Sequence, residues 1–310
     1  MIESDQAAIR LDSPDLSEDH DLYAILHSAL KNRAVAPRAD GPSSQGFWPA
    51  SHFGLDRVTL FREAGECEQE AVLLACSRAV LAESYYIEKC GMYFASKMSL
   101  LAESAQEQML YSHFAADEAT HFYWISNYVS RSDVESYLPN PFIAFLAELL
   151  EKEGKPVLTY IVQVVLEGWG ISHYHSMARD CNDAGLREAF ENIIRDEARH
   201  HGSGLVLFGE QRLSSGYIET IIDILERFFR MVQVGPQMIA SQIARARGPL
   251  SREQKVRVFE ELCSETVTAG KIENLKSLIR SAAHSDAILK ELERRDALRP
   301  FTAAECAALS

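Results

Sequence analysis

The sequence predicts an all-α protein built on a four-helix bundle with further helices before and after it. Glycine and proline are scarce, at 16 and 10 of 310 residues, and few breakers favour long helices over turn-rich β structure. Residues 64–104 contain no proline, and apolar residues such as Val72, Cys76 and Val80 recur there at helical spacing. No segment between residues 64 and 211 has the alternating pattern of a strand.

The elements follow in order along the chain. A helix is expected near residues 16–33, and the proline- and glycine-containing stretch 34–49 is expected to be a loop. Prolines at 139 and 141 mark a break before a short helix near 142–152, and Pro156 suits the first turn of the next helix. The four bundle helices are predicted at 64–104, 105–131, 156–181 and 185–210. They form two pairs joined by a long connection, which is a known four-helix-bundle topology.

Two or three further helices are expected in residues 215–295, with breaks at Gly235–Pro236 and Gly248–Pro249. The chain is therefore divided into an N-terminal helix and loop segment (1–63), the four-helix core (64–211) and a C-terminal helical extension of the same domain (212–310). The extension shows amphipathic helices and no chemical motif of its own.

Composition excludes several classes of partner. The formal net charge of −14 argues against nucleic acid or an anionic membrane as the main partner, because both bind clustered cations. No apolar stretch is long enough for a membrane span, and the acidic N-terminus does not resemble a secretory signal. The six cysteines are scattered without a CxxC pair, so we expect reduced thiols and a cytoplasmic location.

Two copies of one motif carry the chemistry. Asp117-Glu118-Ala119-Thr120-His121 and Asp196-Glu197-Ala198-Arg199-His200 share the pattern D-E-A-x-H, and their histidines are 79 residues apart. A glutamate stands 30 residues before each motif glutamate, and a glycine follows each of these glutamates three residues later: Glu88 with Gly91, and Glu167 with Gly170. The whole set is a twofold repeat with one constant offset.

The repeat suits a pair of metal ions. Positions i and i+3 share one helix face, so each ExxH motif can direct a carboxylate and an imidazole inward together. Four buried carboxylates without cations would be very costly, and two divalent ions remove that cost. Carboxylate and imidazole ligands suit iron or manganese, and zinc less specifically. The alternative is a buried polar network without metal, which would leave these carboxylates uncompensated.

Several neighbouring residues have expected roles around this site. Asp117 and Asp196 precede the histidines by one turn and can orient the imidazoles as hydrogen-bond acceptors. The glycines near Glu88 and Glu167 would leave room for a gas or substrate. Glu83 is the rival to Glu88, but five residues correspond to about 140° of helix, so only one of the two can face the core. The repeat favours Glu88, and Glu83 is expected to be solvated.

This ligand pattern resembles the ferritin-like di-iron carboxylate superfamily, over about residues 64–211. The resemblance implies a ferritin-like bundle in which Glu88 and Glu167 are terminal ligands, Glu118 and Glu197 bridge the ions, and His121 and His200 each bind one ion. It implies two iron ions, with a manganese–iron pair left open, and O2 as co-substrate.

The function implied is that of a non-haem di-iron oxygenase or oxidase that oxidises a C–H or N–H bond of a small organic substrate. Hydroxylation, N-oxygenation, desaturation and C–C cleavage all remain open, because function depends on the pocket and not on the fold. Electrons would come from an external donor or from the substrate, since the chain has no GxGxxG motif and no cysteine cluster. A homodimer is possible. The alternative is a metal-handling protein that oxidises iron or scavenges peroxide.

Overall fold

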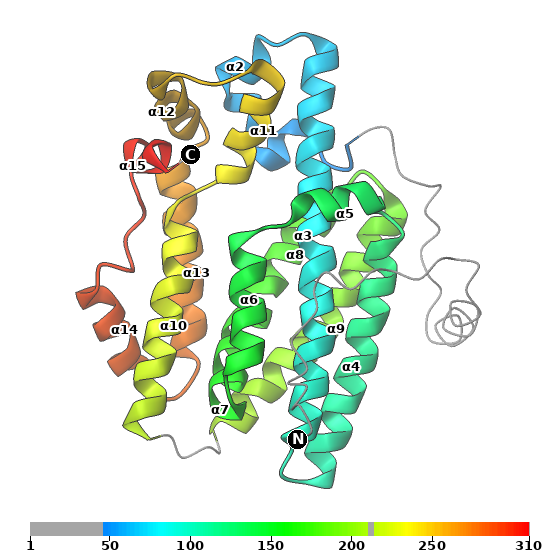
Figure 1. The fold of residues 1–310 in the computed structure, drawn as a ribbon, viewed down its shortest axis with the longest axis vertical. Coiled ribbons are helices and arrows are strands. Elements are labelled where there is room, and N and C mark those ends of the chain that lie inside the picture. Colours follow the sequence, from blue (N-terminus) through cyan, green and yellow to red (C-terminus); the bar gives the residue numbers. More distant parts are fainter. Residues whose placement is uncertain (1–45, 210–213, 310) are drawn as a thin grey trace, which may run out of the picture. The chain divides into compact units, whose positions relative to one another are not determined.

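The computed structural model describes residues 46–209 and 214–309, and all regular secondary structure within these ranges is helical (Figure 1). The predicted all-α class is therefore confirmed for this part of the chain. The helix expected at 16–33 and nearly all of the loop expected at 34–49 lie outside the described residues.

The described residues fall into two compact units. The first unit contains residues 81–155, and the second contains residues 46–80 together with 156–209 and 214–309. The long helix α3 (Glu66–Leu100) contributes residues to both units. This division follows compactness and differs from the three segments expected from the sequence, which remain a prediction.

The first unit holds the C-terminal part of α3 with α4 (Ala105–Ser126), α5 (Arg131–Tyr137) and α6 (Pro141–Lys152). Ser104 caps α4 by accepting a hydrogen bond from the Glu107 amide, and Asn140 caps α6 just before Pro141. Aromatic side chains pack α3 against α4, since the ring centroids of Tyr85 and Phe122 are 4.6 Å apart.

The second unit begins with three short helices that lead into α3: η1 (Ala50–Phe53), η2 (Leu55–Arg57) and α2 (Thr59–Arg62). Further along the chain, α7 (Lys155–Leu158), η3 (Thr159–Leu166) and α8 (Glu167–Asp180) form one helical run, followed by α9 (Ala184–Gly209). Helices α8 and α9 pack against each other. The buried Trp48 ties the start of this unit to α8, because its indole Nε1 donates a hydrogen bond to the Met177 carbonyl at 2.8 Å.

The run 155–180 matches the helix expected at 156–181, but its middle differs in geometry. Residues Thr159–Leu166 form a π-helix, and the Glu167 amide donates to the Val162 carbonyl five residues back. A π-helix is rare and occurs mostly as a short insertion, frequently at functional sites. The segment is rich in β-branched residues, which hold an α-helix less well than unbranched ones do.

Residues 214–309 contain six helices, and five of them lie in the stretch 215–295, where two or three were expected. Their bounds are α10 (Ser215–Gln233), α11 (Gln237–Arg247), α12 (Arg252–Glu261), α13 (Ser264–Arg280), α14 (Ser285–Arg294) and α15 (Ala303–Ala308). The expected breaks after α10 and α11 are confirmed. The unexpected breaks lie at Cys263 and His284, which adopt positive φ angles of 51° and 65° without being glycine. Neither residue is a glycine or a proline, so no local sequence signal marks these two breaks.

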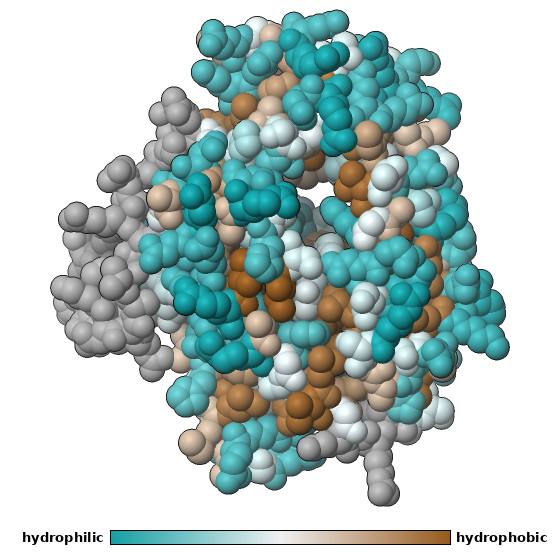
Figure 2. All heavy atoms as spheres, turned by 180° about the vertical axis from the view of Figure 1, so that it is seen from behind, coloured by the Kyte–Doolittle hydropathy of each residue, from teal (hydrophilic) through white to brown (hydrophobic). Residues whose placement is uncertain are grey.

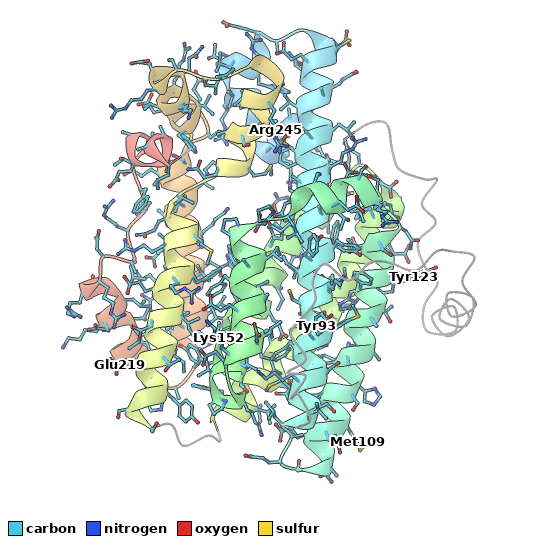
Figure 3. The ribbon with its side chains drawn as sticks, viewed as in Figure 1. Tyr93, Met109, Tyr123, Lys152, Glu219 and Arg245 are labelled. Atoms are coloured by element: carbon cyan, nitrogen blue, oxygen red, sulfur yellow. The ribbon has the colours of Figure 1, made fainter. Side chains whose placement is uncertain are left out.

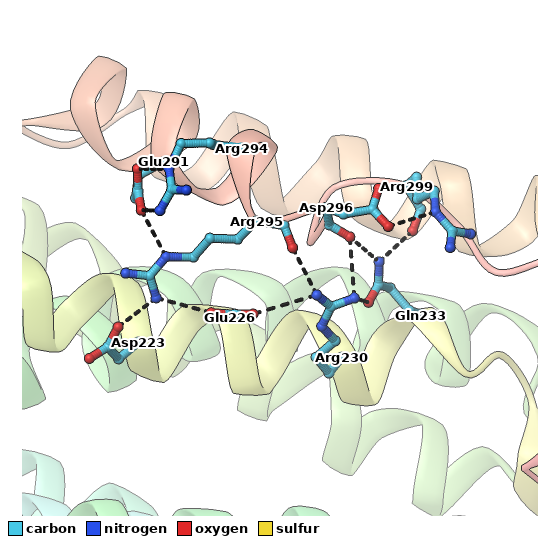
Figure 4. Close-up of polar contacts among 9 residues, drawn as sticks. All are labelled: Asp223, Glu226, Arg230, Gln233, Glu291, Arg294, Arg295, Asp296 and Arg299. Carbon is cyan, nitrogen blue, oxygen red and sulfur yellow. Dashed lines mark hydrogen bonds and ion pairs between the residues drawn. The ribbon is translucent and has the colours of Figure 1, made fainter.

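Polar side chains connect α10 to the end of α14 (Figure 4). Arg295 donates to Glu291 and Glu226, and Arg230 donates to the Arg295 carbonyl at 2.8 Å. The buried Gln233 amide donates to the carbonyls of Asp296 and Arg299, at 3.0 and 2.8 Å. These contacts hold the chain that follows α14 against α10.

Polar and apolar side chains are mixed on the surface that Figure 2 shows. On the face drawn in Figure 2, hydrophilic side chains predominate, and hydrophobic side chains appear between them in small clusters. Within residues 46–209 and 214–309, no helix is both long and apolar enough to cross a membrane.

Candidate metal centre

The first unit brings three of the predicted ligands together. Glu88 comes from α3, whereas Glu118 and His121 come from one face of α4, and all three are buried, with 1%, 4% and 0% exposure. The imidazole Nδ1 of His121 lies 3.2 Å from Glu88 Oε2 and 4.0 Å from Glu118 Oε2. One ligand atom from each residue lies within 4.8 Å of the others. We call these residues the first triad.

A glycine makes the position of the Glu118 carboxylate possible. A Cβ atom added at Gly91 would lie 2.5 Å from Glu118 Cδ and nearer still to Oε2, which is closer than real Cβ contacts. The space beside Gly91 therefore belongs to a ligand carboxylate. The expectation that this glycine leaves room for a gas or substrate was wrong.

The second unit brings together the other three predicted ligands. Glu167 is the first residue of α8, and Glu197 and His200 lie on one face of α9. Glu197 and His200 are buried, and Glu167 is half-buried. His200 Nδ1 lies 3.5 Å from Glu197 Oε2, and one ligand atom from each of the three residues lies within 4.8 Å of the others. We call these residues the second triad.

Each triad fits a divalent cation. Two carboxylates and one neutral imidazole supply oxygen and nitrogen donors with a charge of −2, which one divalent ion would balance. Burying such carboxylates without a cation is costly, and in both triads the imidazole Nδ1 is directed at a carboxylate oxygen. Each unit therefore contains a buried Glu/His cluster that could hold a metal ion.

The expectations for residues near the two triads have different outcomes. Asp196 forms an ion pair with Arg199 on the same helix, three residues later. The orienting role expected for Asp117 and Asp196 remains a prediction. Glu83, expected to be solvated, is half-buried and accepts a hydrogen bond from the Tyr137 hydroxyl. It is Glu88, and not Glu83, that belongs to a cluster that could hold a metal ion.

The two triads have different surroundings despite their repeat. Gly170, the counterpart of Gly91, has no atom within 4 Å of an added Cβ. The close approach in the second unit occurs instead at Gly168, where an added Cβ would lie 2.7 Å from Leu278 Cδ2 and 2.9 Å from His201 Nδ1. Leu278 belongs to α13, so the C-terminal extension packs against Gly168, the residue that follows Glu167.

Sequence reasoning missed Gln163, a fully buried residue of the π-helix. Its side-chain amide donates to the His200 carbonyl at 2.9 Å and to Ser203 Oγ at 2.8 Å. The available signal was a single polar residue within the apolar run Ile161-Val162-Gln163-Val164-Val165, one turn before Glu167.

Comparison with known proteins adds no assignment. No protein-family model matches the chain, and no curated protein matches its sequence.

Proposed function

We propose that each triad binds one iron ion, and that the protein is a non-haem di-iron oxidoreductase that activates O2. The observation that carries the proposal is that each compact unit brings together one Glu/Glu/His triad, whose residues repeat at a constant offset of 79 and are buried except for the half-buried Glu167. Carboxylate-rich ligand sets of this composition suit iron or manganese, and the proposal takes iron as the metal.

The chain's own residues would hold the two ions and keep the site dry. Glu88, Glu118 and His121 would hold one ion, and Glu167, Glu197 and His200 would hold the other. Trp124 lies against the His121 ring with centroids 5.9 Å apart, and it is itself buried. Such an apolar neighbour limits water around the ligands and strengthens electrostatic interactions at the site.

The iron pair, when bound, would supply the redox chemistry toward O2. The proposed substrate is a small organic molecule oxidised at a C–H or N–H bond, with electrons supplied by an external donor or by the substrate. Support for a substrate-shaping role of the C-terminal extension comes from α13, whose Leu278 packs beside Gly168.

Anaerobic Fe(II) titration of metal-free protein tests the metal centre. Wild type should bind two irons per chain, and His200→Ala should lose at least one of them at the same free iron concentration. His113→Ala is the matched control, because His113 is an exposed residue on α4 and should leave the stoichiometry unchanged. An absence of specific Fe(II) binding by wild type would overturn the di-iron proposal.

Two further measurements separate the proposal from its rivals. Two ferric ions that share bridging ligands couple magnetically, whereas two isolated ferric sites give separate high-spin electron paramagnetic resonance signals. O2 consumption that rises with a defined organic substrate supports the oxygenase or oxidase. Stoichiometric oxidation of Fe(II) with no substrate dependence would instead identify a ferroxidase.

A further inference from the structure

Gln163 lies between the two helical segments that carry the second triad. Its side chain is 0% exposed, and its Nε2 donates to the His200 backbone carbonyl and to the Ser203 hydroxyl. His200 is a triad member, and Gln163 stands four residues before Glu167 in the same helical run. One amide thus links the segment that leads into Glu167 to the backbone of His200.

The packing around this amide leaves little freedom. An added Cβ at Gly204 would lie 2.8 Å from Gln163 Cγ and 3.0 Å from its Cβ, so α9 approaches Gln163 at a residue without a side chain. Gly204 follows His200 by one helical turn. The same turn of α9 therefore supplies both the hydrogen-bond acceptor and the space that Gln163 occupies.

We propose that Gln163 is a positioning residue that sets the affinity of the second triad for its metal ion. This inference rests on the proposed metal centre. A metal ion requires its ligand atoms at closely defined separations, and residues that orient ligands typically change metal affinity about 10–100-fold when they are replaced. Gln163 restrains the His200 backbone relative to the run that ends at Glu167, and so restrains the separation of these two ligands.

The amide is chemically specific for this role. The Nε2 group donates two hydrogen bonds, one to a carbonyl oxygen and one to a hydroxyl oxygen. Replacement by methionine keeps length and volume but removes both donors, and leaves the His200 carbonyl without its inter-helix bond. The π-helix is the local geometry in which Gln163 reaches α9.

Gln233 offers a matched control. It is also a fully buried glutamine of the second unit, and its Nε2 also donates to two acceptors, the carbonyls of Asp296 and Arg299 (Figure 4). Neither of those acceptors belongs to a triad residue. Gln233→Met should therefore lower the melting temperature as Gln163→Met does, without changing metal affinity.

The experiment is an anaerobic titration of metal-free full-length protein with Co(II), followed by its visible absorption, and repeated with Fe(II). We expect Gln163→Met to bind one ion as wild type does and the other about 10–100-fold more weakly. Gly204→Ala, which displaces Gln163 without removing its amide, should show the same selective loss and provides a second route if Gln163→Met fails to fold. Circular dichroism verifies folding of each variant.

Two results would overturn this inference alone. In the first, the folded Gln163→Met and Gly204→Ala variants bind both ions as tightly as wild type does. In the second, Gln233→Met weakens metal binding as much as Gln163→Met does. If wild type binds neither Co(II) nor Fe(II), the proposed metal centre and this inference both fail. The two failures are thus distinguished by the wild-type titration.

Discussion

The carboxylate of Glu118 occupies the space that a side chain at Gly91 would need. Gly91 lies on α3, one turn after Glu88, and Glu118 approaches it from α4 so closely that an added Cβ would overlap the carboxylate. The first triad therefore depends on a residue that donates nothing to a metal.

Gly91→Ala should displace the Glu118 carboxylate and weaken metal binding by the first triad at least about tenfold, as other changes beside metal ligands do. Fe(II) titration measures the effect. Gly170→Ala is the matched control, because it is the counterpart in the repeat and has open space around it. That variant should keep its metal affinity, and the greater helix propensity of alanine should stabilise it by up to about 1 kcal/mol. Equal metal affinities for both variants would contradict this account.

Lys97 closes the C-terminal end of α6. Its Nζ donates to the carbonyls of Leu150 at 2.7 Å and Glu153 at 2.8 Å, which lack helical partners at this position. Lys97→Met should lower the free energy of unfolding by about 1.5–3 kcal/mol, the range for hydrogen bonds to charged groups. Urea denaturation measures the change.

Lys152→Met provides the control for Lys97. Lys152, labelled in Figure 3, is 64% exposed and pairs with Glu148 on α6 itself. Its replacement should change stability by no more than about 0.5 kcal/mol, as for other exposed helical ion pairs. If Lys152→Met lowered the free energy of unfolding more than Lys97→Met does, the stability of α6 would not depend on its contact with Lys97 of α3.

His173 should make the protein sensitive to mild acid. Burial lowers the pKa of its imidazole to about 4, and the positive charges of Lys271 and His52 act in the same direction. The unfolded chain, with a pKa near 6.5, binds the proton first, so stability is lost as the pH falls from about 6.5 to 4. His173→Gln should reduce this slope, measured by urea denaturation at several pH values. An unchanged slope in the variant would show that His173 does not contribute.

Glu291 should make the stability of the protein depend on pH in a more acidic range than His173 does. Hydrogen bonds from Arg294 and then Arg295 lower the pKa of its carboxyl group from 4.5 to about 2. The stabilisation is therefore complete above pH 4.5 and is lost as the pH falls toward 2. The stability difference between wild type and Glu291→Gln should shrink over this interval in low salt, and should be smaller throughout in high salt. A difference that is constant with pH would rule out this contribution.

The sequence predicted the elements that have strong local signals. The all-α class, the main helices around the ligands and the breaks at glycine–proline pairs are confirmed, because proline, glycine and periodic apolar residues act locally. The residues of the two triads could be found because two separate helix pairs obey one spacing rule. Glu88 was preferred to Glu83 on that basis, and only Glu88 joins a triad.

What the sequence did not reveal depends on contacts between distant segments. The breaks at Cys263 and His284 use left-handed backbone in residues that rarely signal it. The role of Gly91 depends on where α4 directs Glu118, and the role of Gln163 depends on the approach of α9 at Gly204. No local pattern contains these distances.

The π-helix at Thr159–Leu166 also bears on how the chain tolerates changes in its length. A π-helical segment of this kind is equivalent to an extra residue inserted into an α-helix. An insertion inside an α-helix would normally rotate every later residue by about 100°. Here the irregular segment ends where Glu167 begins, so an extra residue in this segment would leave the 30-residue spacing from Glu167 to Glu197 unchanged. The two copies of the repeat can thus differ in local backbone geometry while keeping the same spacing between their triad residues.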